Sequence, residues 1–146
     1  PYGGCGVGKK EILKIPFFGL AYWLAGHLLI DRGNNHKAVA SMKKMSDFVK
    51  AKDLSIWIWP EGTRSLDGKL IPFKKGFVHL ALATGLPIVP VVLHGAHKIW
   101  PAKTMDFYPG EVRVEVLDSI KTDNWSKENL DKHVEEVRGI MAKALT

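Results

Sequence analysis

Short apolar runs alternate along this 146-residue chain with longer segments whose apolar residues recur at helical spacing. The runs contain the β-branched and aromatic residues that favour strands, and they cover residues 27–31, 55–59, 88–93 and 111–117. Helical patterns cover residues 16–25, 34–51, 74–84 and 126–145. Strands that alternate with helices predict an α/β fold. We expect a single domain over residues 1–146, with a largely parallel, mixed sheet flanked by helices.

Individual residues refine these elements. Gly26 and Gly85 are placed to end the helices that precede them, because glycine adopts the left-handed conformation at little cost. The second apolar run is continuous, which is typical of a strand buried on both faces and predicts that Trp57 and Trp59 belong to the core. Pro90 has no backbone N–H to donate, so its strand should lie at a sheet edge or contain a bulge.

Charge and cysteine content limit the partners. The chain has 21 Lys and Arg against 15 Asp and Glu, and residues 1–103 hold 15 of the basic residues but only 6 of the acidic ones. This uneven surplus favours an anionic partner, which could be a phosphate ester, a membrane surface or a nucleic acid. The single cysteine, Cys5, excludes an internal disulfide and a zinc site built from several thiolates. No uninterrupted apolar run approaches the ~18 residues of a membrane span.

Polar clusters follow three of the predicted strands. They are Asp31-Arg32, the segment PEGTRS at 60–65 and the segment HGAH at 94–97. Because parallel strands end at the same edge of a sheet, we expect Arg32 and Arg64 to converge there. Two guanidinium groups suit a phosphate, since each can donate paired hydrogen bonds to its oxygens. Gly62 would let the backbone approach such a ligand closely.

The remaining side chains of PEGTRS could each bind only certain kinds of ligand group. Thr63 and Ser65 can donate from their hydroxyl groups. Glu61 would repel a phosphate, but it could hold an arginine in position or accept a hydrogen bond from a substrate hydroxyl. Structural alternatives stay open for both clusters, because Asp31-Arg32 could be a strand-end ion pair and PEGTRS a solvated turn.

Six histidines are candidate general bases. His94 and His97 are the best placed, at the end of a strand. An HxxH pair without a nearby Cys or acidic residue is a weak metal signal, so structural roles are favoured for both. His79 lies within an apolar helical pattern and is predicted to be a core residue. The sequence shows no evident partner for the others, which are His27, His36 and His133.

In their order and spacing, several segments resemble the motifs of the glycerolipid acyltransferases, especially the bacterial enzymes that acylate 1-acyl-sn-glycerol-3-phosphate. The segments are GHLLIDR at 26–32, PEGTRS at 60–65, FKKG at 73–76 and LPIVPVVLHG at 86–95, and residues 7–19 look like the stretch after the family's first motif. The resemblance implies acyl transfer from acyl-CoA or acyl-carrier protein to lysophosphatidic acid, giving phosphatidic acid in phospholipid biosynthesis. In this reaction the acceptor hydroxyl attacks the thioester directly, so neither a cofactor nor a metal is expected.

The resemblance also implies roles for residues at the matching positions. Arg32 would bind the phosphate of the acceptor, and Lys9 is a further candidate for that phosphate. Pro90 matches a motif associated with shaping the site and binding the acyl donor. The acceptor pocket would be lined by Glu61, Gly62, Thr63, Arg64 and Ser65.

One motif of the family is absent from the sequence. The family's first motif, His-x4-Asp, supplies the base that takes the proton of the acceptor hydroxyl and the acid that orients this base. None of the six histidines here is followed by Asp at the fifth position. We therefore expect an N-terminally truncated acyltransferase domain that is inactive as given and has no catalytic residue of its own.

Two other classes of function are open to such a chain. A non-catalytic module for anionic-lipid headgroups is the main alternative, and the missing motif favours it. Nucleic-acid binding is not expected, because the aromatic residues lie in apolar runs and not among Lys and Arg. The apolar segment 16–25 and the basic surplus suit an anionic membrane surface, on the cytoplasmic face and, in a bacterium, of the inner membrane.

Overall fold

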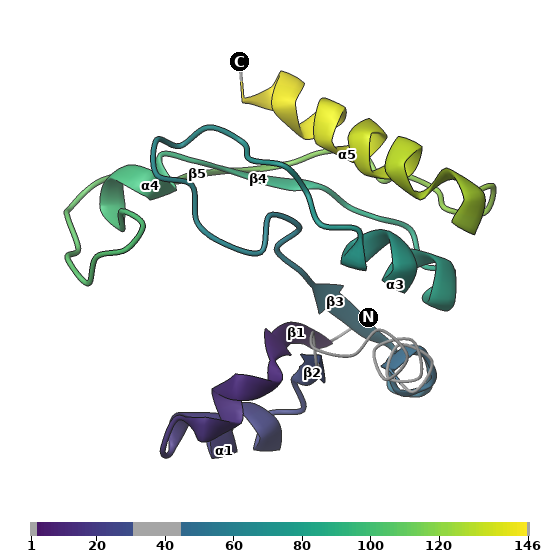
Figure 1. Cartoon of the computed structure of the whole chain (residues 1–146), viewed down its shortest axis with the longest axis horizontal. Coiled ribbons are helices and arrows are strands. Elements are labelled where there is room, and N and C mark those ends of the chain that lie inside the picture. The colour runs from purple at the N-terminus through teal and green to yellow at the C-terminus, as the bar shows by residue number, and fades with distance from the viewer. Residues whose placement is uncertain (1–2, 31–44, 146) are drawn as a thin grey trace. The chain divides into compact units, whose positions relative to one another are not determined.

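The computed structural model describes residues 3–30 and 45–145. The chain divides into two compact units, residues 1–58 and 59–146. Both units combine helices and strands, as Figure 1 shows. A parallel three-stranded sheet in the first unit and a separate pair of strands in the second give a mixed α/β structure, so the predicted fold class is confirmed.

The first unit contains a sheet with the strand order β2-β1-β3. Its strands are β1 (Gly3–Lys9), β2 (Leu28–Ile30) and β3 (Leu54–Trp57), and both pairings are parallel. A short 3₁₀ helix, η1 (Lys10–Lys14), and helix α1 (Phe18–Leu24) connect β1 to β2. The helix predicted at 16–25 and the strand predicted at 27–31 are therefore present.

The helix predicted at 34–51 lies partly outside the described residues. Its described part, residues 45–51, is helical. Met45 and Val49, four residues apart, are both buried, as expected for one face of an amphipathic helix.

Strand β1 is not among the strands predicted from the sequence, although it forms the centre of the sheet. Four of its seven residues are glycine, a residue that strands disfavour. Side chains of neighbouring elements occupy the space at these glycines. A Cβ atom would lie 2.9 Å from Leu54 Cδ2 at Gly3, and 2.8 Å from the Tyr22 hydroxyl at Gly8. Close packing by neighbours thus replaces the side chains that β1 lacks.

The second unit contains a two-stranded antiparallel sheet of β4 (Val91–His94) and β5 (Arg113–Val116). Helix α5 (Leu130–Ala144) packs against β4 and against α3 (Gly76–Thr84), as Figure 1 shows. The buried residues of α5 include Val134 and Val137, which are three positions apart and therefore lie on one face of the helix. The short helices α4 (Ala96–Ile99) and η2 (Lys127–Asn129) complete this unit.

The prediction that Pro90 lies at a sheet edge or at a bulge is confirmed, because β4 belongs to a two-stranded sheet and the pairing is interrupted beside Pro90. Ile88 pairs with Ile120, whereas Val91 pairs with Val116. Three residue steps from Ile88 to Val91 therefore face four steps from Val116 to Ile120, so the extra residue lies on the strand opposite Pro90. Pro90 lies in this interruption, where it is buried and its carbonyl accepts the backbone N–H of Leu117 at 3.0 Å.

Two expectations about the strands are wrong. The strand that precedes His94 was expected to run parallel beside those ending at 31 and 59. Instead, β4 pairs antiparallel with β5 and joins no parallel strand among the described residues. The strand at 55–59 is also not buried on both faces, because Trp57 is 57% exposed and Trp59 is 65% exposed. Trp57 lies against the bare backbone of Gly4, which offers no side chain to cover the indole ring.

Candidate substrate-binding site

The PEGTRS segment belongs to a loop whose beginning and end are joined by two hydrogen bonds. Lys74 donates its backbone N–H to the Pro60 carbonyl at 2.7 Å. The Glu61 carboxylate accepts the backbone N–H of Ile71 through Oε2 at 3.1 Å. Glu61 is thereby fixed as a brace across the loop, and no arginine partner for it is present in the part of the chain that the structure describes. Gly62 has a φ of 71°, a left-handed conformation that favours glycine here.

Ser65 is engaged in a local turn. Its Oγ donates to Asp67 Oδ1 at 3.0 Å, and Asp67 Oδ1 also accepts the backbone N–H of Lys69 at 3.1 Å. The backbone N–H of Lys69 and then the Ser65 hydroxyl lower the pKa of Asp67 below its ordinary value. The loop therefore uses Ser65 for its own structure, while the neighbouring Thr63 is exposed.

Arg64 is held by an aromatic side chain and by backbone carbonyls. Its guanidinium carbon lies 4.0 Å from the centre of the Trp100 ring, which is the geometry of a cation–π contact. Its Nη1 donates to the carbonyl oxygens of Trp100 at 3.3 Å and Pro101 at 3.1 Å. Trp100 could not be predicted as a partner from the sequence, because 36 residues separate it from Arg64 and no spacing rule connects them.

The other predicted phosphate ligands belong to the first unit. Lys9 is exposed at the carboxyl end of β1, where it is in register with Ile30, the last residue of β2. The carboxyl ends of these parallel strands therefore coincide, as in the sites of α/β sheets. Arg32 lies outside the described residues, so its convergence with Arg64 stays a prediction.

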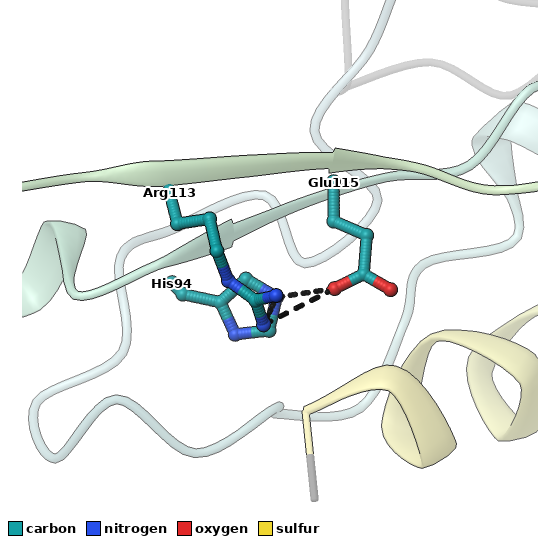
Figure 2. Close-up of polar contacts among 3 residues, drawn as sticks. All are labelled: His94, Arg113 and Glu115. Carbon is teal, nitrogen blue, oxygen red and sulfur yellow. Dashed lines mark hydrogen bonds and ion pairs between the residues drawn. The ribbon is translucent and has the colours of Figure 1, made fainter.

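His94, a candidate base, is engaged on the surface of the antiparallel sheet. Figure 2 shows it with Arg113 and Glu115, which both belong to β5. His94 Nε2 lies 2.8 Å from Glu115 Oε2, and Arg113 Nη2 lies 3.3 Å from the same oxygen. Arg113 Nη2 also lies 3.1 Å from His94 Nε2, so this ring nitrogen donates to Glu115 in one tautomer and accepts from Arg113 in the other. Nε2 of His94 is thus occupied in a cross-strand contact.

Two histidines that lacked a partner in the sequence have one in the structure. His27 Nδ1 accepts the backbone N–H of Gly6 at 2.9 Å. His133 is 7% exposed, and its ring stacks on Trp125 with centroids 4.4 Å apart. His79 is half-buried in α3, and His36 lies outside the described residues. In the described ranges, no three His, Cys, Asp or Glu residues are grouped so that they could hold a metal ion.

Cys5 is unsuited to nucleophilic chemistry. The residue is buried in β1, and its Sγ donates to the Ser55 carbonyl at 3.6 Å. Burial raises the pKa of the thiol, so the reactive thiolate is disfavoured.

In the second unit, neutral groups hold Arg64, and in the first unit Lys9 lies at the carboxyl ends of parallel strands. Each unit by itself therefore presents a cation that suits an anionic ligand. A family model described as Acyltransferase matches residues 5–94, which is more than half of the chain. The chain therefore belongs to this acyltransferase family, and the resemblance in its motifs is confirmed.

Relatives with established names match nearly all of this chain. It is 44% identical over 145 residues to the 1-acyl-sn-glycerol-3-phosphate acyltransferase of Limnanthes douglasii, covering 99% of this chain and 52% of that protein. It is 41% identical over 140 residues to the enzyme of the same name from Escherichia coli, covering 95% of this chain and 56% of that protein. The chain thus spans about half the length of the relatives it matches.

A solved structure has a similar fold. The crystal structure of the 1-acyl-sn-glycerophosphate (LPA) acyltransferase from Thermotoga maritima superposes with a TM-score of 0.71 and 29% sequence identity. The match covers 97% of this chain and 55% of that one.

Proposed function

We propose that this chain is the acceptor-binding part of an enzyme that transfers an acyl group from acyl-CoA or acyl-carrier protein to 1-acyl-sn-glycerol-3-phosphate. The product is phosphatidic acid. The observation that carries this proposal is the match of nearly the whole chain to relatives named 1-acyl-sn-glycerol-3-phosphate acyltransferase, together with membership of the acyltransferase family. The ordered motifs of the sequence agree with it.

Within this proposal, the residues of the chain bind the acceptor and do not perform the proton transfer. Arg64 presents a cation from the PEGTRS loop, and Arg32 and Lys9 are the further phosphate ligands. Gly62 and Thr63 contribute backbone and hydroxyl donors beside Arg64, whereas Glu61 and Ser65 support the loop. Pro90, which directly precedes β4, helps to shape the site and to bind the acyl donor. The reaction needs no cofactor, since the acceptor hydroxyl attacks the thioester carbonyl directly and the thiol leaves.

We also propose that the protein works on an anionic membrane surface, at the cytoplasmic face. Apolar side chains on and next to α1 are exposed, including Phe17 at 91% and Leu24 at 69%. Such side chains and the net charge of +6 suit a bilayer with anionic headgroups. In the described parts of the chain, no helix has both the length and the apolar character to cross a membrane.

A thioester-release assay with lysophosphatidic acid and acyl-CoA tests the division of roles. Because no His-x4-Asp sequence occurs in residues 1–146, we expect the chain alone to release no CoA above background. We expect the same chain to bind lysophosphatidic acid and not the neutral monoacylglycerol that lacks the phosphate. Turnover by the chain alone would show that another residue serves as the base, and equal binding of both lipids would contradict the phosphate site.

The alternative, a non-catalytic module for anionic-lipid headgroups, is favoured only by the absence of His-x4-Asp. The two proposals differ in selectivity. A module that recognises charge alone would bind phosphatidylglycerol, which has a phosphodiester, as well as lysophosphatidic acid, which has a phosphate monoester. An acceptor site would prefer the monoester. Competition between these two lipids therefore decides between the proposals.

A further inference from the structure

Arg64 extends from an exposed loop, and a long side chain in that setting ordinarily samples many rotamers. A guanidinium that recognises a phosphate must hold its planar fork in one orientation, and any freedom lost on binding weakens the affinity. A device that fixes Arg64 before the ligand arrives would therefore matter for binding. The structure contains one.

Trp100 supplies this device through two kinds of contact. Its indole ring lies against the guanidinium at 4.0 Å, while its backbone carbonyl and that of Pro101 accept hydrogen bonds from Nη1. The ring and the two carbonyl groups belong to the consecutive residues Trp100 and Pro101. Together they restrain both the plane of the guanidinium group and its rotation within that plane. In the described part of the chain, these hydrogen bonds of Arg64 involve Nη1 alone, which leaves the other guanidinium nitrogens to a ligand.

The groups that hold the Arg64 guanidinium do not neutralise its positive charge. Carbonyl oxygens and an aromatic face are neutral, unlike the carboxylates that usually hold an arginine. None of the ion pairs found among the described residues includes Arg64. Within the described ranges the guanidinium is thus oriented without being neutralised, which is the state that an anionic ligand requires.

Trp100 is itself held in place. Its Nε1 donates to the Thr104 carbonyl at 3.1 Å, and its ring stacks on Phe107 with centroids 4.8 Å apart. The loop around it is closed by a hydrogen bond from the Tyr108 backbone N–H to the Ile99 carbonyl at 2.9 Å. A platform fixed by three separate contacts can impose its orientation on a mobile arginine.

We propose that Trp100 is a positioning residue that orients Arg64 for the phosphate monoester of the acceptor lipid. This inference rests on the proposed function, because it takes the phosphate as the ligand of Arg64. Trp100 does not touch the phosphate. It acts by holding the guanidinium in the orientation that binds.

Calorimetric binding of a short-chain lysophosphatidic acid, kept below its micelle concentration, tests the proposal. We expect Arg64→Ala to weaken binding strongly and Trp100→Ala to weaken it about three- to tenfold, in line with a lost cation–π contact. Trp100→Phe retains an aromatic face and should recover most of the affinity. Met105→Ala, on the same loop with a side chain that is 79% exposed, is the matched control and should bind like the wild type.

A double variant separates positioning from general damage. If Trp100 acts through Arg64, Trp100→Ala should cost nothing further in the Arg64→Ala background. Loss of affinity in Arg64→Ala with none in Trp100→Ala would overturn the inference and leave the proposed function intact. No loss in Arg64→Ala would instead contradict the use of Arg64 in the proposed function.

The inference can also be tested without a ligand. The NMR signal of the Arg64 Nε–H group should report a restricted side chain in the wild type and in Trp100→Phe, and a mobile one in Trp100→Ala. Equal mobility in all three proteins would overturn the inference even if no lipid bound. Melting temperatures of the three proteins show whether the loop change unfolds the chain.

Discussion

Gly19 is a buried residue at which an additional methyl group has no room. A Cβ atom there would lie 2.5 Å from the carbonyl oxygen of Ile12 and 2.7 Å from the Cα of Leu13. These are backbone atoms of η1, so no side-chain rotation can relieve the clash. We expect Gly19→Ala to lower the free energy of unfolding by about 1–3 kcal/mol, measured by urea denaturation.

Gly139 provides the matched control for this substitution. It lies within α5, and a Cβ there would meet nothing within 4 Å. Because alanine favours a helix interior over glycine, Gly139→Ala should raise the free energy of unfolding by about 0.5–1 kcal/mol. Destabilisation by both substitutions would show that contact with η1 is not the cause at Gly19.

The carboxyl group of Asp67 should titrate below its ordinary range. The backbone N–H of Lys69 and the Ser65 hydroxyl stabilise its charged form and lower its pKa. The turn around Asp67 is therefore favoured at pH values above the ordinary pKa of an aspartate, and this contribution is lost as the pH falls through the lowered pKa. NMR titration of the side-chain carboxyl carbon measures this value.

Ser65→Ala removes one of the two donors to Asp67, so the pKa of Asp67 should rise toward its ordinary value in this variant. An unchanged titration would mean that the hydroxyl does not donate to the carboxylate in solution. Ser65 would then be available to a ligand, as the resemblance to the family implied.

At the scale of elements, the beginning of α5 is fixed by a histidine. The ring of His133 stacks on Trp125 at an angle of 10°, and its Nε2 accepts the backbone N–H of Ser126 at 3.3 Å. We expect His133→Ala to lower the free energy of unfolding by about 2 kcal/mol, because it leaves a cavity and an unpaired N–H group. Lys132→Ala, the exposed neighbour in the same helix, should change it by less than about 0.5 kcal/mol. Equal effects in thermal or urea unfolding would contradict this role.

The charged contacts on the surface of the antiparallel sheet contribute less to the free energy of unfolding. Arg113 and Glu115 interact at 3.3 Å on a surface where the arginine is largely exposed. Such pairs contribute little because water screens them. Their effect is to occupy His94, the residue that sequence reasoning placed best for a base.

At the scale of the whole molecule, the amount of exposed apolar surface is the dominant property. Among the described residues, large apolar side chains are exposed in both units, including Phe17, Leu24, Trp59, Met105 and Phe107. Contiguous apolar patches are uncommon on soluble monomers. We expect the isolated chain to self-associate or to require detergent, as measured by size-exclusion chromatography with light scattering. A concentrated monomer without detergent would contradict this and would weaken the proposal of a membrane surface.

Vesicle sedimentation tests the electrostatic part of that proposal. With a net charge of +6, the chain should bind vesicles that contain anionic lipid, and less so as the salt concentration rises. Oligonucleotides are the control, and we expect no comparable binding to them. Equal binding to vesicles and oligonucleotides would indicate charge attraction without lipid recognition.

The class of fold and the family could both be predicted from local patterns in the sequence. Periodic apolar residues predict α1, α3 and α5, and short branched runs predict β2, β3, β4 and β5, because local propensity and burial act in the same direction there. Pro90 predicted an edge strand or a bulge because a missing N–H has the same consequence in any strand. The motifs around Arg64 and Pro90 predicted the family because their order is specific.

The way in which these elements pair and pack depends on long-range contacts that appear in the folded chain alone. The tertiary structure made a strand of the glycine-rich segment 3–9, since Leu54 and Tyr22 fill the space that glycine leaves open. It paired β4 with β5, exposed Trp57, and brought Trp100 to Arg64 across 36 residues. These features depend on contacts between residues distant in the sequence, and no local pattern records which distant residue fills a given space.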